Sequence, residues 1–160
     1  MNKVGLLCCF LGNKRPPQYL RLFIDSCRYN NDIDFHLFTE WDYTEYEIPN
    51  NIKPHKFSHA EFNRLASAKC NIEINILHGY KLCDLKPAWP HIFEDYIKDY
   101  TYVGWFDIDL IFGRINNFFY NFINHNSDLY FSITKEYSSG ALTIIKNTPT
   151  MRLLYQQAKG

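Results

Sequence analysis

The sequence has 160 residues, with 17 Lys and Arg against 17 Asp and Glu, so its formal net charge is zero. A surface that follows a nucleic-acid backbone normally needs an excess of basic residues, so this balance argues against a nucleic-acid partner. With 46% hydrophobic residues, the chain has enough apolar material for the core of one globular domain. No apolar run approaches the roughly 20 residues of a membrane-spanning helix, so no transmembrane segment is predicted.

The cysteines indicate a reducing compartment. They are Cys8, Cys9, Cys27, Cys70 and Cys83. Their number is odd and no C-x-x-C pair occurs, which favours buried, reduced thiols over disulfides or a metal cluster. We therefore expect a cytoplasmic protein. The apolar start of the chain is too short for a signal peptide and no small-residue cleavage site follows it, so we interpret it as a strand.

The opening of the chain predicts a β-α-β unit. A continuous apolar run over 4–11 predicts the first strand, and Pro17 suits the first position of a following helix. A second short strand is expected over 35–39. Such a unit pairs its strands in parallel, so the sheet is expected to be mainly parallel. The apolar face of the helix consists of residues at helical spacing: Leu20, Phe23, Ile24 and Cys27.

The next part of the chain is less regular. The acidic, aromatic and proline-containing stretch over 40–55 predicts a long irregular connection. Ser58 and Glu61 match a capping box at the start of another helix. The alternating isoleucines over 72–76 fit either a short strand or the end of that helix, and the pattern does not decide between them.

The second half alternates helices and strands. A strand buried on both faces is expected over 103–112, a helix over 115–123, and two further strands over 129–133 and 141–145. One helical face is expected before the first of these strands, at Trp89, Phe93, Tyr96 and Ile97.

The segment Asn147-Thr148-Pro149 predicts the cap of a last helix. The apolar face of that helix would carry Met151, Leu154, Tyr155 and Ala158. No repeat or linker interrupts the pattern, so we predict a single domain over 1–160.

Two aspartates interrupt the most apolar stretch of the chain, where Asp107 and Asp109 follow Tyr102-Val103-Gly104-Trp105-Phe106. If the strand continued, both carboxylates would point to one face and repel each other unless they shared a proton or bound a cation. If the strand ends here and the carboxylates line a cleft, a hard divalent cation is the expected occupant, with phosphate oxygens completing its shell. A further interpretation is that both aspartates cap the following turn.

The motif and its surroundings resemble a known class of enzymes. Asp107-Ile108-Asp109 resembles the metal-binding D-x-D motif of GT-A glycosyltransferases, which use nucleotide-sugar donors. The resemblance becomes closer with Tyr80-Lys81-Leu82-Cys83-Asp84-Leu85-Lys86-Pro87, Ile92-Phe93-Glu94-Asp95-Tyr96-Ile97 and Leu110-Ile111-Phe112-Gly113. Together these segments look like an uncharacterised glycosyltransferase-like family of bacterial and viral proteins.

The resemblance implies an α/β, Rossmann-like GT-A nucleotide-diphospho-sugar transferase fold with a mainly parallel sheet flanked by helices. It implies a metal-dependent glycosyltransferase of the hexosyltransferase type, acting in polysaccharide, lipopolysaccharide or glycoconjugate synthesis. Its partners would be a nucleotide-sugar donor and a carbohydrate or glycolipid acceptor. The resemblance is also compatible with a peripheral association of the protein with a membrane. Members of such families tend to be longer, so we expect this chain to lack a C-terminal acceptor portion.

The same resemblance assigns roles to individual residues. Asp107 and Asp109 would bind Mn²⁺ or Mg²⁺, with Asp107 also contacting the donor, and Tyr80, Lys81, Asp84 and Lys86 would bind the donor. Lysines meet phosphate as point charges, and a carboxylate such as Asp84 can accept a hydrogen bond from a base or a ribose hydroxyl. The alternative is a solvated surface charge for each lysine and a helix cap for Asp84. No catalytic residue is identified, since nothing in the sequence positions the candidate bases Asp128 and Glu136.

Other functions have less support. A catalytically silent nucleotide-binding or interaction module would retain the same sheet. A phosphatase of the D-x-D type normally carries its motif after the first strand, whereas Asp107 lies late in the chain. The six histidines form no H-x-x-x-H or H-E-x-x-H arrangement, so a zinc site is not predicted. Ser138-Ser139-Gly140 lacks the flanking pattern of a nucleophile elbow, so a hydrolase triad is not predicted either.

Overall fold

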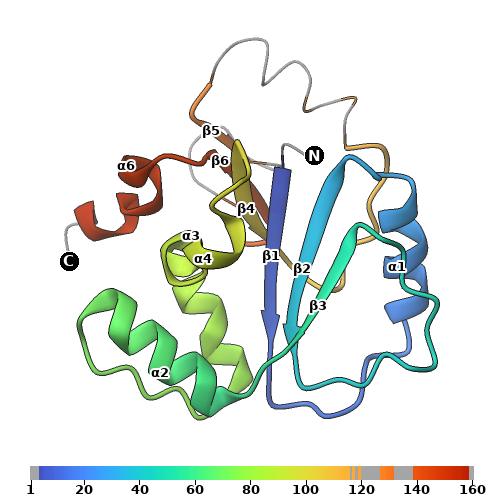
Figure 1. The fold of residues 1–160 in the computed structure, drawn as a ribbon, viewed down its shortest axis with the longest axis horizontal. Helices are drawn as coiled ribbons and strands as arrows, with labels where there is room; N and C mark the ends of the chain where they lie inside the picture. Colours follow the sequence, from blue (N-terminus) through green and yellow to red (C-terminus); the bar gives the residue numbers. More distant parts are fainter. Residues whose placement is uncertain (1–3, 116, 118, 120–126, 132–138, 159–160) are drawn as a thin grey trace.

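The protein has a mixed α/β fold built on one sheet. The computed structural model describes residues 4–115, 117, 119, 127–131 and 139–158. Six strands pair in the order β3-β2-β1-β4-β6-β5, of which the first four run parallel, while β6 is antiparallel to both of its neighbours (Figure 1). In sheet order they are β3 (Ile52–Lys56), β2 (Ile33–Thr39), β1 (Val4–Phe10), β4 (Tyr102–Phe106), β6 (Leu142–Lys146) and β5 (Leu129–Phe131).

Helices cover both faces of the sheet. Figure 1 shows α1 on one side and α2, α3, α4 and α6 on the other. The helices are α1 (Leu20–Arg28), α2 (His59–Cys70), α3 (Trp89–Ile92), α4 (Glu94–Ile97) and α6 (Pro149–Arg152), with 3₁₀ helices η1 (Gly79–Ala88) and η2 (Leu154–Gln157). The expected α/β class, with a mostly parallel sheet flanked by helices, is therefore confirmed. Among the described residues, no helix is long and apolar enough to cross a membrane.

The sheet separates two apolar cores, because successive side chains of a strand point to opposite faces. In β1, Leu6 packs into the core under α1 and Leu7 into the core under α2 and α3. Phe23 of α1 stacks on Phe106 of β4 with ring centroids 5.6 Å apart, and Phe38 stacks on Phe93 at 4.0 Å on the other face. These stacks fix both helical layers against the central strands.

Several local expectations are confirmed. The first two strands pair in parallel across α1, whose predicted apolar residues are all buried. The capping box at α2 has both reciprocal hydrogen bonds between Ser58 and Glu61. The side chain of Thr148 accepts a hydrogen bond from the Met151 N–H at the start of α6. All five cysteines are free thiols, but the expected burial holds only for Cys8, Cys9 and Cys27, since Cys70 is half-buried and Cys83 is exposed.

Other boundaries differ from the sequence-based expectations. Pro17 is not the first helical residue, because α1 begins at Leu20 after Tyr19. The end of the supposedly irregular 40–55 stretch belongs to the edge strand β3, where a proline is tolerated because one side of an edge strand needs no ladder hydrogen bonds. The segment 72–76 is neither strand nor helix, since α2 ends at Cys70 and Asn71 turns the chain with φ of 54°.

The second half also needs corrections. The strand expected over 103–112 ends at Phe106, and Ile111 is 63% exposed. The helix expected through Trp89 and Ile97 is two short helices, with Tyr96 40% exposed. On the last helical segment, Leu154 and Ala158 are exposed, so its apolar face is narrower than expected. The helix expected over 115–123 lies largely outside the described residues, although Ile115 and Phe119 are buried.

A series of hydrogen bonds between partly buried polar side chains links β2 and β3 to Tyr100 in the loop before β4. The Tyr100 hydroxyl donates to the Asp34 carboxylate at 2.8 Å, so His36 Nε2–H must donate to the Tyr100 oxygen at 2.9 Å. His36 Nδ1 then accepts from His55 Nε2–H at 3.0 Å. Burial, reinforced by His55, lowers the pKa of His36 from 6.5 to about 4. Both rings are therefore neutral in the folded protein at neutral pH.

This series of hydrogen bonds predicts that acid lowers the stability of the folded protein. Between pH 6.5 and about 4 the unfolded state binds a proton that folded His36 does not, so the free energy of unfolding should fall as pH falls through this window. A loss of roughly 2–3 kcal/mol is expected from urea titrations across the window. In His36→Gln the slope should flatten, whereas the exposed control His78→Gln should keep the slope of the wild type. An equal slope in His36→Gln would contradict the assignment.

Candidate functional site

The two aspartates lie on a turn immediately after β4. The Leu110 N–H donates to the Asp107 carbonyl at 3.2 Å and closes the turn. Ile108, between them, is 5% exposed and packs into the core under α1, while Asp109 is exposed. Within the part of the chain that the structure describes, neither carboxylate accepts a hydrogen bond from the turn backbone. The turn-capping interpretation therefore gains no support, and the carboxylates remain available for other partners.

The position of this turn in the sheet is significant. From β1 the chain continues to β2 on one side, whereas β4 pairs with β1 on the other side, with Leu7 opposite Trp105. β1 and β4 are therefore adjacent at the point where the strand order changes direction, and their carboxyl ends lie side by side at one edge of the sheet. Open α/β sheets bind ligands in the crevice at such a point, and Asp107 and Asp109 lie on one of its two loops.

The start of β6 holds the turn in place. The Asp107 N–H donates to the Ala141 carbonyl at 2.9 Å, and Phe106 pairs with Leu142 in the antiparallel ladder. The neighbouring carbonyl of Gly140 accepts from Lys86 Nζ at 2.8 Å. The backbone before β6 thus fixes both the aspartate turn and the nearest cation.

Lys86 forms an ion pair with Asp107. Its ammonium donates to Asp107 Oδ1, and its side chain is only 6% exposed against 37% for Asp107. A buried ammonium is costly unless its donors are satisfied, and here Asp107 and Gly140 supply two acceptors while the Trp89 ring lies 6.0 Å from Nζ. Asp107 Oδ1 is thereby held by the protein, while Oδ2 has no partner among the described residues.

The helix η1 reaches from the end of β1 to the end of β4. At its first residue, a Cβ on Gly79 would lie 2.0 Å from the Leu11 carbonyl oxygen, so only glycine permits this approach. Gly12, next to it, has φ of 89° and its N–H donates to Glu40 at 2.8 Å. At the other end of η1, Lys86 reaches the aspartate turn.

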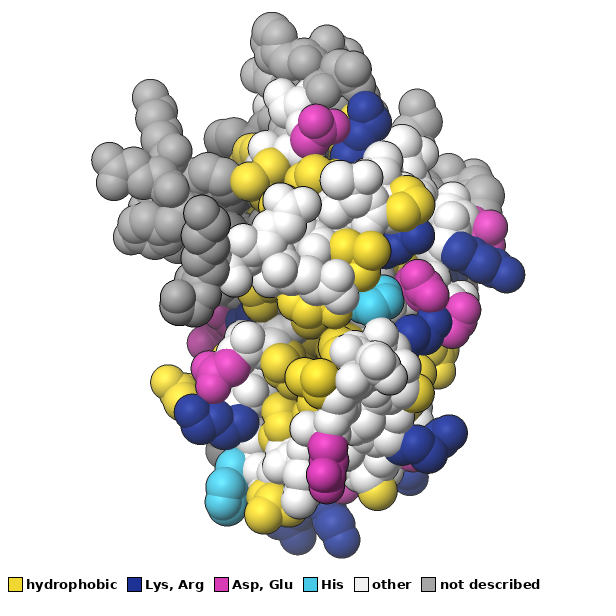
Figure 2. All heavy atoms as spheres, turned by 90° about the vertical axis from the view of Figure 1, so that its left-hand side faces the viewer, with side chains coloured by type: hydrophobic (Ala, Val, Ile, Leu, Met, Phe, Trp, Pro, Cys, Tyr) yellow, Lys and Arg dark blue, Asp and Glu magenta, His cyan; other side chains and the backbone are white. Residues whose placement is uncertain are grey.

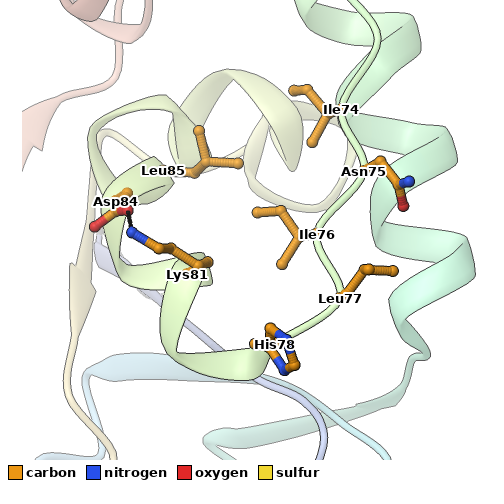
Figure 3. A pocket seen from close by; sticks show the side chains of 8 residues that line it. All are labelled: Ile74, Asn75, Ile76, Leu77, His78, Lys81, Asp84 and Leu85. Atoms are coloured by element: carbon orange, nitrogen blue, oxygen red, sulfur yellow. Dashed lines mark hydrogen bonds and ion pairs between the residues drawn. The ribbon is translucent and has the colours of Figure 1, made fainter.

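The remaining predicted donor-binding residues form a separate group on η1. Lys81 and Asp84 make an exposed ion pair at 3.1 Å, and both line a cavity of about 410 Å³ (Figure 3). Tyr80, beside them, is 81% exposed. The structure thus brings Lys86 together with Asp107, and Lys81 together with Asp84. Nothing in these contacts tests whether Tyr80, Lys81 and Asp84 bind a donor, which stays a prediction.

The carboxylates fit a divalent cation of a particular kind. Asp109 has no hydrogen bond or ion pair with any described residue, and no cluster of three or more metal-ligating side chains occurs in the same ranges of the chain. From the described residues, the cation would therefore receive two carboxylates at most. Mg²⁺ and similar ions are commonly held by one or two carboxylates, with water and substrate phosphate filling the other positions. The donor set is compatible with that arrangement.

Sequence reasoning missed one neighbour of the turn. The pKa of Tyr19 is raised by burial and by the negative charge of Asp109, which places its phenol near the aspartate turn. Tyr19 precedes α1, on the loop that leaves β1, and is 39% exposed. The sequence could have indicated Tyr19, because this residue follows the strand that pairs with β4. The interpretation of Pro17 as the first helical residue placed Tyr19 inside the helix instead.

The candidate base Asp128 is not brought to the turn. Asp128 hydrogen-bonds through its carbonyl to the Lys146 N–H, and Lys146 pairs with Tyr102 at the start of β4, whereas Asp107 follows its end. Asp128 therefore lies toward the opposite edge of the sheet. Glu136, Ser138 and His125 lie outside the described residues.

Buried lysine and aspartate should be energetically coupled. Lys86→Met should lower the free energy of unfolding by about 1–3 kcal/mol, because it leaves Asp107 and the Gly140 carbonyl without a donor. Combining it with Asp107→Asn should cost less than the sum of the single changes, with a coupling of about 1–2 kcal/mol in urea unfolding. The exposed pair Lys81 and Asp84, changed in the same way, is the control and should couple by less than about 0.5 kcal/mol. Equal coupling in the two pairs would contradict the structural role of Lys86.

Comparison with known proteins identifies a family but no activity. A family model described as a family of unknown function, DUF6625, matches residues 6–160. No curated protein and no solved structure matches the chain.

Proposed function

The chain belongs to DUF6625, and we propose that it binds a nucleotide-sugar donor through a divalent cation at the Asp107 and Asp109 turn and acts as a glycosyltransferase or its donor-binding portion. The observation that carries the proposal is the exposed carboxylate of Asp109, which has no partner among the described residues and lies beside Asp107 on a turn at the carboxyl end of β4. This is where a parallel sheet of this topology is expected to receive a ligand. The resemblance of the surrounding motifs to GT-A glycosyltransferases supports the same conclusion.

The side chains have complementary roles in this proposal. Asp109 and the free oxygen of Asp107 would ligate Mn²⁺ or Mg²⁺, which, when bound, offsets the negative charge of the departing diphosphate. Lys86 holds Asp107 Oδ1 and so fixes the orientation of that carboxylate. Its ammonium also raises the local electrostatic potential, which favours binding of an anionic group. The acceptor would be a carbohydrate or a glycolipid.

One observation favours a second candidate, a binding module without catalysis. Lys86 already neutralises Asp107 through a partly buried ion pair, so the charge of this aspartate has a partner without any metal. In that case Asp109 would be a solvated surface charge. The two candidates differ in whether metal and nucleotide bind together.

Asp109→Ala should abolish metal-dependent nucleotide binding without unfolding the domain. A ligand that binds only the folded state raises its melting temperature, so UDP, GDP and CDP are each tested with and without Mn²⁺ in a thermal-shift assay. One nucleotide should stabilise the wild type by several degrees with Mn²⁺ only, and Asp109→Ala should lose this shift. The matched control is Asp99→Ala, because Asp99 is an exposed aspartate before β4 rather than after it.

The outcomes separate the candidates. A shift that survives in Asp109→Ala would defeat the metal assignment. If no nucleotide stabilises a cooperatively melting wild type, the silent module is favoured. Release of nucleoside diphosphate from the matching nucleotide sugar, measured with Mn²⁺ and wild-type protein, would then distinguish an active transferase from a donor-binding portion.

A further inference from the structure

Two adjoining cavities lie beside η1, apart from the aspartate turn. The first, of about 410 Å³, lies between η1 and the segment 74–78 (Figure 3). The second, of about 630 Å³, continues toward the end of the described chain and is lined by Tyr155 and Ala158. Both share Ile74, Asp84 and Leu85, so together they form one extended groove, here called the η1 groove. Their walls do not include Lys86, whose side chain is directed at Asp107.

The lining of the η1 groove is aliphatic. In the first cavity, Figure 3 shows Ile74, Ile76 and Leu85 around the hollow. The second cavity adds Ile72, Pro87 and Ala88. Pockets of this size bury most of a small ligand, and their specificity comes from a few polar groups in an apolar lining. Polar side chains also line the groove, but Asn75 points away from it and His78, Lys81, Asp84 and Gln156 are exposed, so the aliphatic part matches a hydrocarbon better than a sugar ring does.

The wall formed by 74–76 is held in a fixed conformation. Asn63 of α2 donates to the Ile76 carbonyl at 3.0 Å and accepts from its N–H at 2.9 Å. The Ser67 hydroxyl accepts from the Ile74 N–H at 2.9 Å and donates to its carbonyl at 3.3 Å. Since Ile74 and Ile76 are two residues apart, this extended backbone directs both side chains toward η1, whereas Asn75 points away (Figure 3). The irregular segment is thus a preformed wall.

Apolar side chains also surround the groove. Ile72 is 63% exposed and Leu77 is 72% exposed. On the face shown in Figure 2, hydrophobic side chains gather in a hollow near the centre of the molecule. Exposed apolar groups beside a preformed apolar cavity mark an interaction site better than scattered surface residues do.

One end of the groove carries charge. Lys81 lies at the first cavity with a side chain that is 64% exposed, paired only with the exposed Asp84 in the described chain. An exposed ion pair contributes little free energy, so the Lys81 ammonium can pair with a phosphate at small cost. We propose that the η1 groove binds a single-chain lipid phosphate, with the hydrocarbon chain along the aliphatic walls and the phosphate at Lys81.

The η1 groove is distinct from the proposed donor site at the aspartate turn, and the lipid proposal does not depend on donor binding. Because η1 carries Lys86 on one side and Lys81 on the other, it separates a lipid in the groove from the aspartate turn. Under the proposed function, that lipid belongs to the acceptor class.

The probe is dodecyl phosphate below its micelle concentration, measured by isothermal titration calorimetry against dodecanol and inorganic phosphate. Wild-type protein should bind dodecyl phosphate, whereas inorganic phosphate should give no measurable heat. Ile76→Asp should weaken binding at least about tenfold, because it places a charge where the chain lies. Lys81→Gln should weaken the binding of dodecyl phosphate about three- to tenfold and leave the binding of dodecanol unchanged.

Two further variants keep the test decisive. Leu77→Asp changes a largely exposed groove residue, so it should fold even if Ile76→Asp does not, and it should also weaken binding. Leu22→Asp is the matched control, because Leu22 is an exposed leucine on α1, and it should bind as the wild type does. Mn²⁺-dependent nucleotide binding should be unchanged in Ile76→Asp, Leu77→Asp and Leu22→Asp, so a failure of this proposal is distinguishable from a failure of the donor site.

Several results would overturn the proposal. They are equal binding of inorganic phosphate, no binding of dodecyl phosphate by cooperatively folded protein, and an equal loss in Leu22→Asp. A wild-type dimer that Leu77→Asp dissociates in sedimentation velocity would assign the groove to a second copy of the chain. Binding to phosphatidylglycerol vesicles that does not depend on Ile76 would assign this face to a membrane surface instead.

Discussion

The ammonium of Lys86 is the constraint on which the carboxyl edge of the sheet depends. It is almost fully buried, so two acceptors must be present at fixed positions. Asp107 provides one because β4 stops at Phe106, and Gly140 provides the other because the backbone before β6 pairs with the same turn. A longer β4, or a different register of β6, would leave a buried charge without a partner. The Lys86 side chain thus links the end of β4, the aspartate turn and the backbone before β6.

The helix η1 carries this constraint across the sheet to β1. Its first residue approaches the Leu11 carbonyl so closely that a side chain would not fit, and its later part delivers Lys86 to β4. A 3₁₀ helix has three residues per turn, so Lys81 and Asp84, three apart, share one face. Lys86, two residues beyond Asp84, falls on another face. One short helix can therefore separate an apolar groove from a polar turn.

The sequence predicted the fold class and the main elements because burial patterns are local. Leu20, Phe23, Ile24 and Cys27 have one helical spacing and one environment, and the capping box at Ser58 needs only the next three residues. The pairing of Lys86 with Asp107 was not predictable in this way, because the two residues meet only through the sheet topology. The conformation of 72–76 was undecided for the same reason: its hydrogen bonds go to Asn63 and Ser67 on another element. For β3, Pro54 obscured an edge strand.

The interpretation of the site rests finally on Asp109. A structural ion pair needs one carboxylate, and Asp107 already satisfies Lys86. With two carboxylates and one ammonium, the turn retains one negative charge, and among the described residues no Lys or Arg forms an ion pair with Asp109. A divalent cation would reverse the sign of the local charge and make the turn a site for a diphosphate. Packing explains why Ile108 is buried and why Asp107 is paired, but it places no requirement on Asp109, and the proposed metal and phosphate binding would supply one.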